Sequence, residues 1–286
     1  MHIGITSTNI AFYAEREHAA ALARTAEAAG VESLWTFEHV VVPGGYESTY
    51  PYSRDGRMPG DGRAAITDPL TWLCFCGAVT ERIKLGTGIL ILPEHNPVLL
   101  AKEAATVDRL SGGRLLLGIG VGWLKEEFDA LGVPWARRGA RTDGYVEVLR
   151  RLWTEEEVTL DTEWATLTRA RCSPQPVQAG GVPIVVGGHS EAAARRAGRI
   201  GDGFYPAAPP DRVAALLQVM RRAAEDAGRD PSAIEVTAGD PTADPDSVRR
   251  YEDLGVSRVV VGVPTYDPSQ VEAAFGKLHE ELLSRL

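Results

Sequence analysis

The chain is poor in cysteine, in long apolar runs and in positive charge, and each shortage argues against a class of protein. Its three cysteines, Cys74, Cys76 and Cys172, do not make a disulfide framework. Cys74 and Cys76 fall in the apolar stretch TWLCFCGAV, where we expect core side chains rather than redox or metal groups. No apolar run approaches the ~20 residues of a membrane span. The net charge of -9 argues against nucleic acid or an anionic membrane surface as a partner.

Signals of several particular chemistries are also missing. We find no metal-ligand spacing of histidine and cysteine, no nucleophile elbow and no Walker-type phosphate loop. We therefore predict no metal site. The chain begins on the strand-like HIGIT without the basic and apolar pattern of a secretion signal, so we expect a cytoplasmic protein.

The chain does contain a regular alternation of short β-like runs and amphipathic helical runs. The β-like runs are rich in Val, Ile and Leu, which is typical of strands buried in a parallel sheet. About eight β/α units fit the 286 residues, near the ~250 of a usual (β/α)8 barrel. We predict an α/β fold, a (β/α)8 TIM barrel, as a single domain over residues 1–286. The alternative is a doubly wound open sheet. The third strand is expected over residues 84–92 and the helix after the fourth strand over residues 142–153.

Two insertions interrupt the alternation. Residues 40–66 follow the second predicted strand and hold Tyr46, Tyr50 and Tyr52 among several glycines. We expect this segment to act as a lid. Residues 154–181 precede the fifth strand, and the stretch TLDTEWATLTRARC within them predicts a small hairpin.

Glu38 and His39 close the second predicted strand. Active sites of barrels lie at the carboxyl ends of the strands, so both side chains are expected at the mouth. An imidazole titrates near neutrality and can give or take a proton, while a carboxylate beside it can orient it. We take both as candidate catalytic residues. The alternative is an exposed or capping pair at the start of a loop.

Two glycine-rich turns follow later strands. Gly120, in RLLLGIGVGW, lies where the backbone can be approached closely by a flat ring or a phosphate, although simple turn formation is the alternative. In VVGGHSEAAARRAG, a strand runs through Gly187 and Gly188 into His189 and a helix that begins at Ser190. Free N–H groups at a helix N-terminus bind anions, so this turn is a candidate phosphate site; an ordinary capped turn is the alternative.

The positions of the arginines do not clearly indicate a binding site. Arg114 lies at the start of the fourth predicted strand, which is the wrong end of a barrel for an active site. Arg137, Arg138 and Arg141 form a basic cluster after that strand, and a solvated helix face explains such a cluster equally well.

Four motifs, in this order and spread over nearly the whole chain, resemble the luciferase-like monooxygenase superfamily, and most closely its branch that uses the deazaflavin coenzyme F420. The motifs are SLWTFEHVVVP, ERIKLGTGILILP, HNPVLLAKEAATVDRLSGGRLLLGIGVGWLKEEFDALG and PIVVGGHSEAAARRAGRIGDGFYP.

The resemblance implies a barrel with the ring of F420, or alternatively FMN, in its mouth. It implies a non-prolyl cis peptide behind the ring, which we place at Gly88–Ile89, and a histidine beside the ring, which corresponds to His39. Glu38 would orient that histidine. The resemblance assigns the cofactor phosphate to the turn formed by Gly187, Gly188, His189 and Ser190, and also to Arg114, against the barrel rule given above.

The resemblance also implies a function. We expect an F420-dependent oxidoreductase that transfers hydride between the deazaflavin and a small organic molecule. The resemblance also suggests a homodimer. Sugar-phosphate dehydrogenases of the superfamily place a catalytic glutamate after strand four, where this chain has Trp123, which argues against that substrate class. The alternatives are an FMN-dependent monooxygenase that uses molecular oxygen, a flavin-binding protein without turnover, and a cofactor-free barrel isomerase.

Overall fold

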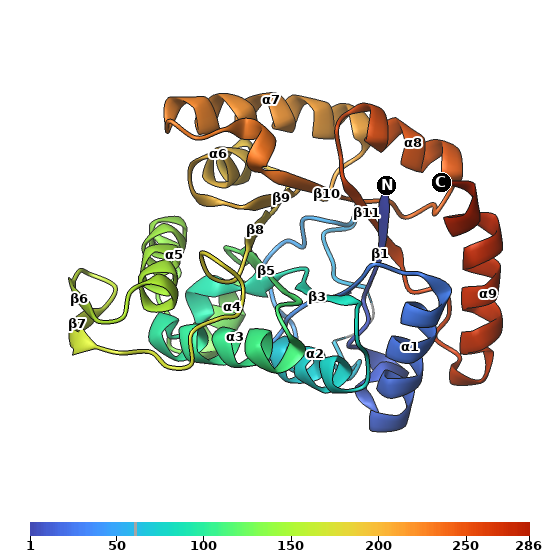
Figure 1. The fold of residues 1–286 in the computed structure, drawn as a ribbon, viewed down its shortest axis with the longest axis horizontal. Helices are drawn as coiled ribbons and strands as arrows, with labels where there is room; N and C mark the ends of the chain where they lie inside the picture. The colour runs from blue at the N-terminus through green and yellow to red at the C-terminus, as the bar shows by residue number, and fades with distance from the viewer. Residues whose placement is uncertain (60–61) are drawn as a thin grey trace.

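A parallel β-sheet closes on itself to form a barrel in the computed structural model, which describes residues 1–59 and 62–286 (Figure 1). The sheet strands are β1 (His2–Thr6), β2 (Ser33–Thr36), β3 (Lys84–Thr87), β4 (Leu90–Ile91), β5 (Leu115–Gly120), β8 (Ile184–Gly187), β9 (Gly203–Tyr205), β10 (Glu235–Gly239) and β11 (Arg258–Gly262). Strand β1 pairs with β2 and β11, and the pairing of β3 with β5 completes the ring. Because β3 and β4 both pair with β5, they are two halves of one barrel strand, and the nine sheet strands make an eight-stranded barrel.

Helices cover the outside of the barrel (Figure 1). They are α1 (Arg16–Ala29), α2 (Pro69–Ala78), α3 (Pro97–Ser111), α4 (Lys125–Ala130), α5 (Arg138–Thr154), α6 (Glu191–Ile200), α7 (Pro210–Asp226), α8 (Pro245–Asp253) and α9 (Val271–Glu281). Their ends follow local sequence signals. In α3, the Asn96 side chain accepts hydrogen bonds from the first-turn N–H groups, and Gly112 ends the helix in the left-handed conformation. Within the described ranges no helix is long and apolar enough to cross a membrane.

The inside of the barrel is filled by aromatic and aliphatic side chains beneath the mouth. Trp35 is fully buried and meets the ring of Tyr205 edge to face, with centroids 5.4 Å apart. The surrounding cluster is completed by Leu116, Val185 and Val260. A Cβ atom at Gly86 would lie 2.6 Å from the Trp35 ring, so only glycine leaves room for this indole. These side chains close the barrel interior beneath the mouth.

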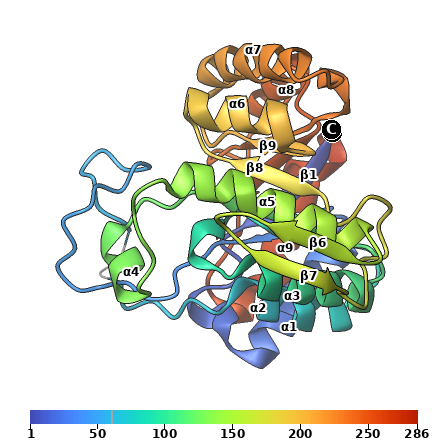
Figure 2. The same ribbon diagram turned by 90° about the vertical axis from the view of Figure 1, so that its left-hand side faces the viewer.

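Two insertions project from the barrel where the sequence predicts them. The chain between β2 and α2 forms a long loop that carries no helix or strand in its described part, and Figure 2 shows it beside α4. The second insertion is an antiparallel hairpin of β6 (Val158–Asp161) and β7 (Thr166–Ala170), which lies outside α5 in both views (Figures 1 and 2).

The closed barrel confirms the predicted fold and excludes the open sheet. Three details differ from the expectation. The third strand is broken into β3 and β4 instead of running through residues 84–92. Helix α5 begins at Arg138, four residues earlier than predicted, and α4 was not predicted at all. Its six residues are too few to show a helical period in the sequence.

Candidate active site at the barrel mouth

His39 lies at the carboxyl end of β2 and is held by a carboxylate from a distant part of the chain. Its Nδ1 is 2.8 Å from Oε2 of Glu127, a fully buried residue of α4. The other oxygen of Glu127 accepts hydrogen bonds from the N–H groups of Val40 and Val41, at 2.6 and 3.1 Å. Since the carboxylate accepts from Nδ1, Nε2 of a neutral His39 is left as an acceptor. Glu127 thus fixes both the imidazole and the first residues of the long loop.

Glu38 does not orient His39, and that part of the sequence prediction is wrong. Its Oε2 accepts from the N–H of Ile91 at 2.5 Å, and its Oε1 lies 2.9 Å from Nε2 of His95. Adjacent residues leaving a strand point in different directions, so Glu38 turns toward β4 while His39 turns toward α4. Burial alone would lower the pKa of His95, but the hydrogen bond and the charge of Glu38 raise it above its ordinary value.

Glu94 brings a third carboxyl group to this region. It ends the 3₁₀ turn Leu92–Glu94 that follows β4. Burial, together with the charges of Glu127 and Glu38, raises its pKa to about 9. At neutral pH the group is therefore a carboxylic acid rather than a carboxylate.

The long loop is fastened to α4 and carries an aromatic cluster over the mouth. Oε1 of Glu126 accepts from the N–H groups of Glu47 and Ser48, at 2.7 and 3.0 Å. Trp123 lies at the centre of the cluster, with its ring edge to face with those of His39, Tyr46 and Tyr50 at centroid separations of 5.7, 5.5 and 5.1 Å. Tyr50 in turn contacts Tyr52.

The backbone between β3 and β4 contains a cis peptide bond at Gly88–Ile89, as expected. The Ile89 side chain reaches across the barrel toward β5 and β8. A Cβ atom would lie 2.2 Å from Ile89 Cδ1 if it were added at Gly120, and 2.4 Å from Ile89 Cγ2 at Gly187. Gly120 and Gly187 therefore leave room for Ile89, which is a packing reason for both glycines that the sequence did not reveal.

The turn between β8 and α6 has the features of an anion site. Gly188 has a φ of 126°, and its N–H donates to the carbonyl of Tyr205. Ser190 caps α6 by accepting from the N–H of Ala193. Between them, the His189 N–H and the buried Nδ1 of its ring have no hydrogen-bond partner among the described residues. Ordinary capping accounts for Ser190 but leaves the buried ring nitrogen of His189 without a partner.

A cavity of about 350 Å³ adjoins this turn. It is lined by Pro51, Tyr52, Ser53, Arg54, His189 and Ala207. The rings of Tyr52 and His189 meet edge to face, 5.0 Å between centroids. The long loop and the β8–α6 turn therefore line one open space, with an arginine among its lining residues, and this chemistry fits a phosphate group.

Arg114 is not part of the mouth, which corrects the prediction that it contacts a cofactor phosphate. It precedes β5, at the amino-terminal end of the barrel. Its guanidinium donates to the carbonyl groups of Gly77, Thr80, Ile83 and Ser111 and to the Thr80 hydroxyl. These five hydrogen bonds use all five donors of the side chain. The residue ties the ends of α2 and α3 together.

The basic cluster at the start of α5 is largely committed to other contacts. Arg137 pairs with Glu163 at 2.5 Å, and buried Arg141 donates to the carbonyl of Pro134. Both guanidinium groups also lie over the ring of Trp164 in the hairpin insertion. Arg138 stacks 3.7 Å above the Trp135 ring, and its buried Nε has no hydrogen-bond partner in the described structure.

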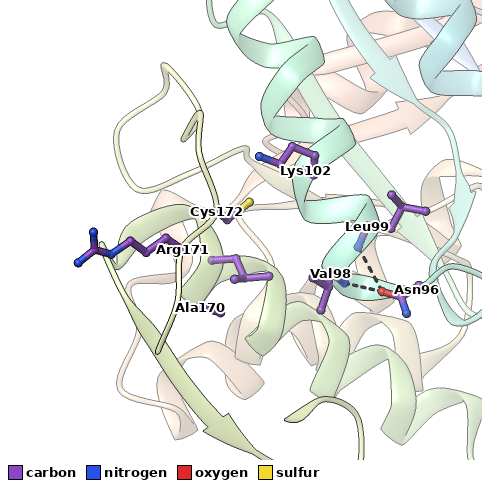
Figure 3. Close-up of a pocket in the computed structure, with 8 residues that line it drawn as sticks. Asn96, Val98, Leu99, Lys102, Ala170, Arg171 and Cys172 are labelled. Atoms are coloured by element: carbon purple, nitrogen blue, oxygen red, sulfur yellow. Dashed lines mark hydrogen bonds between the residues drawn. The ribbon is translucent and has the colours of Figure 1, made fainter. Parts of the chain in front are cut away.

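A second cavity, of about 580 Å³, lies on the outside of the barrel between α3, α5 and the hairpin (Figure 3). Lys102 and Cys172 face this space, whereas the Arg171 side chain extends away from it. None of the predicted site residues lines it. In residues 1–59 and 62–286, no group of three or more His, Cys, Asp or Glu side chains is arranged to hold a metal ion.

Sequence reasoning missed Glu127, Glu94 and His95, the groups that surround Glu38 and His39. Glu127 looks like one of several exposed charges in WLKEEFDA, because the sequence shows little difference between Glu126 and the buried Glu127. One local signal was available: Glu127 immediately precedes a buried phenylalanine in a short amphipathic turn.

A family model described as luciferase-like monooxygenase matches residues 4–284. The chain belongs to the luciferase-like monooxygenase family. Among its relatives, an uncharacterised protein of Mycobacterium tuberculosis is 36% identical over 243 residues, covering 84% of this chain and 83% of the relative. An F420-dependent glucose-6-phosphate dehydrogenase of Nakamurella multipartita is 34% identical over 215 residues, 73% of this chain and 58% of the relative.

Solved structures of other proteins share the barrel. The monooxygenase RslO1 from Streptomyces bottropensis superposes with a TM-score of 0.78 at 24% identity, covering 99% of both chains. An F420-dependent secondary alcohol dehydrogenase, solved with an F420-acetone adduct, gives a TM-score of 0.78 at 19% identity over 100% of this chain and 99% of the other. At these identities the likeness concerns the fold.

Proposed function

We propose that this luciferase-like protein is an F420-dependent oxidoreductase that acts on a small organic molecule. The observation that carries the proposal is the layout of the mouth. A histidine held by a buried carboxylate lies after β2, and a turn with unused hydrogen-bond donors lies after β8. The cofactor of two similar proteins, the F420-dependent glucose-6-phosphate dehydrogenase and the F420-dependent secondary alcohol dehydrogenase, supports F420 as the cofactor.

The residues of the mouth fit a cofactor with a flat ring and a phosphate. The phosphate would be held by the N–H groups of the turn and by His189, with Arg54 of the long loop opposite. The ring would lie near Gly88 and Ile89, within reach of His39. Bound F420 supplies hydride transfer to or from the substrate, and the protein supplies binding, orientation and electrostatics.

His39 would handle the proton that accompanies the hydride. Glu127 holds Nδ1, so the tautomer and the ring plane are set, and Nε2 would accept and relay that proton within the mouth. Trp123 and the tyrosines of the long loop would cover the reacting atoms and exclude water. A single domain, a cytoplasmic location and a homodimer stay predictions from the sequence and the resemblance.

An FMN-dependent monooxygenase is the second candidate, supported by the structural similarity to the monooxygenase RslO1. A test presents the protein with reduced F420 or reduced FMN, each with a panel of ketones and conjugated alkenes, with and without oxygen. We expect substrate-dependent, oxygen-independent oxidation of reduced F420. Oxidation of reduced FMN that consumes oxygen and yields a hydroxylated product would favour the monooxygenase. Binding with neither reaction would favour a flavin-binding protein without turnover.

A further inference from the structure

Glu94 carries a carboxyl group that the account so far does not use. Both of its oxygens are shielded from solvent, and neither has a hydrogen-bond partner among the described residues. Buried polar groups in native proteins are nearly always paired, because an unpaired one costs ~1–3 kcal/mol. The group also follows the carboxyl end of a barrel strand, where substrates bind.

The neighbouring titratable groups are already committed to other partners. Glu38, from the end of β2, bonds Ile91 and His95, and Glu127, from α4, bonds His39 and two loop amides. Both raise the electrostatic cost of a charge on Glu94.

No nearby cation offsets this cost in the described structure. Helix α5 also packs against the turn that holds Glu94. Its four arginines are engaged elsewhere: Arg138 and Arg141 lie over the rings of Trp135 and Trp164. Arg150 pairs with Asp202 and Arg151 with Glu155. His95, the next residue in the chain, is paired with Glu38. A negative charge on Glu94 would therefore be buried beside two carboxylates without an ion pair, and the neutral acid avoids that cost.

We propose that Glu94 is the acid of this mouth: a neutral carboxylic acid that donates a hydrogen bond, and then a proton, to an oxygen-bearing substrate that is itself uncharged. The two carboxylates of Glu38 and Glu127 disfavour an anionic substrate at the same place. The substrate class that fits is a neutral ketone, aldehyde or conjugated enone. This substrate class rests on the proposed function, whereas the neutral state of Glu94 does not.

The proposed step balances without a further reagent. A bound reduced deazaflavin would supply a hydride, which carries two electrons, for a new bond to the substrate carbon. The electron pair of the C=O bond, or of the enone through its conjugation, moves onto oxygen and takes the proton of Glu94. The substrate is reduced at the expense of the bound cofactor, and Glu94, left as a carboxylate, would regain its proton through His39, which shares Glu127 as a neighbour.

Infrared difference spectroscopy on the purified protein tests the neutral acid without any cofactor. At pH 7 we expect the C=O stretch of a protonated carboxyl in the wild type and its loss in Glu94→Gln. The band should disappear as the pH passes about 9. Cyclohexenone serves as a neutral carbonyl probe and cyclohexanecarboxylate as its anionic counterpart. Saturating cyclohexenone should shift the band to lower frequency, and the carboxylate should leave it in place.

Thermal unfolding supplies a second measurement. A group whose folded pKa is raised contributes stability below its unfolded pKa, and this stability is lost as the pH rises through the folded value. The wild type should therefore lose melting temperature between pH 5 and 9 relative to Glu94→Gln, which carries no such group. Replacement of the exposed Glu156 by Gln should leave the pH profile of the wild type unchanged.

Each outcome bears on a different part of the proposal. Absence of the carboxyl band, or a Glu94→Gln variant whose melting profile is parallel to that of the wild type, overturns the neutral acid. A band that cyclohexenone leaves unmoved overturns the contact with a carbonyl substrate. If the band is present and shifts but reduced F420 is never oxidised, the proposed function fails and Glu94 still stands as the acid.

Discussion

His39 owes its orientation to a residue 88 positions further along the chain. The end of β2 brings His39 to the mouth, and the contact between Nδ1 and Glu127 fixes the orientation of its ring. The sequence suggested that the adjacent Glu38 would orient His39. Glu38 is used elsewhere, to join the end of β2 to His95 and to the backbone of β4.

The replacement His39→Asn isolates the proton-handling role. The amide nitrogen of asparagine takes the place of Nδ1 and can still donate to Glu127, so the loop amides and the buried carboxylate keep their partners. We expect normal folding and cofactor binding with turnover reduced by about 10²–10⁴-fold, the usual contribution of a general acid–base group. Unchanged turnover over the pH range would make His39 a bystander, and an unfolded variant would make its role structural.

Arg114 is expected to matter for stability and not for the cofactor. Replacement by methionine keeps part of the side chain but removes every donor, leaving the carbonyls at the ends of α2 and α3 unpaired. We expect a loss of about 1–3 kcal/mol in unfolding free energy with an unchanged dissociation constant for F420. Arg109→Met, at an exposed position of α3 with one hydrogen bond to the carbonyl of Gln175, is the matched control and should cost less. Weaker F420 binding by the Arg114 variant would restore the phosphate role.

The β8–α6 turn is the element that links the fold to the cofactor. Gly188 has a φ of 126°, and a Cβ atom there would approach the Ala193 Cβ to 3.1 Å. Gly188→Ala should therefore shift the turn and weaken binding of F420 and FMN. The phosphate-free deazaflavin and riboflavin should be affected less.

A control separates backbone strain from phosphate binding. Gly228 also has a positive φ, of 70°, with open space around it, so Gly228→Ala imposes strain away from the mouth. Its ligand affinities should equal those of the wild type. Equal losses for ligands with and without phosphate in the Gly188 variant would show that the turn is only architectural.

Elements with strong local signals could be predicted from the sequence, and short or interrupted ones could not. Helix α3 has a capping asparagine, a first-turn proline and a terminal glycine, and its bounds follow them. Helix α4 has only six residues, and the residue before it provides no side-chain cap. The N–H of its first residue donates instead to the Ser48 hydroxyl of the long loop. A partner 77 residues away in the chain leaves no local trace.

At the scale of the whole molecule, the barrel and the place of its mouth were predictable because eight buried strands repeat one pattern. The contents of the mouth depend on contacts between separate β/α units. The Glu127–His39 and Glu38–His95 pairs are of this kind, and so is the packing of Ile89 against Gly120 and Gly187. Residue types at strand ends indicated candidates, but only the closed barrel shows which of them meet.

The net charge of -9 affects how the molecule interacts with anionic cofactors. F420 carries a polyanionic tail that FMN lacks, so the protein as a whole repels it unless local cations attract it. Two arginines of the expected basic cluster are committed to the hairpin and Arg138 lies over the Trp135 ring, which leaves Arg54 of the long loop for this role. Attraction by an exposed group such as Arg54 is screened by salt, with a Debye length of about 10 Å at 0.1 M.

Equilibrium titration of the pure protein with F420 and with FMN, at low and at high salt, tests the central claim most directly. The account predicts that F420 binds more tightly than FMN and that its dissociation constant rises with salt. Tight, stoichiometric binding of FMN with no detectable binding of F420 would contradict the account and establish the monooxygenase as the better proposal.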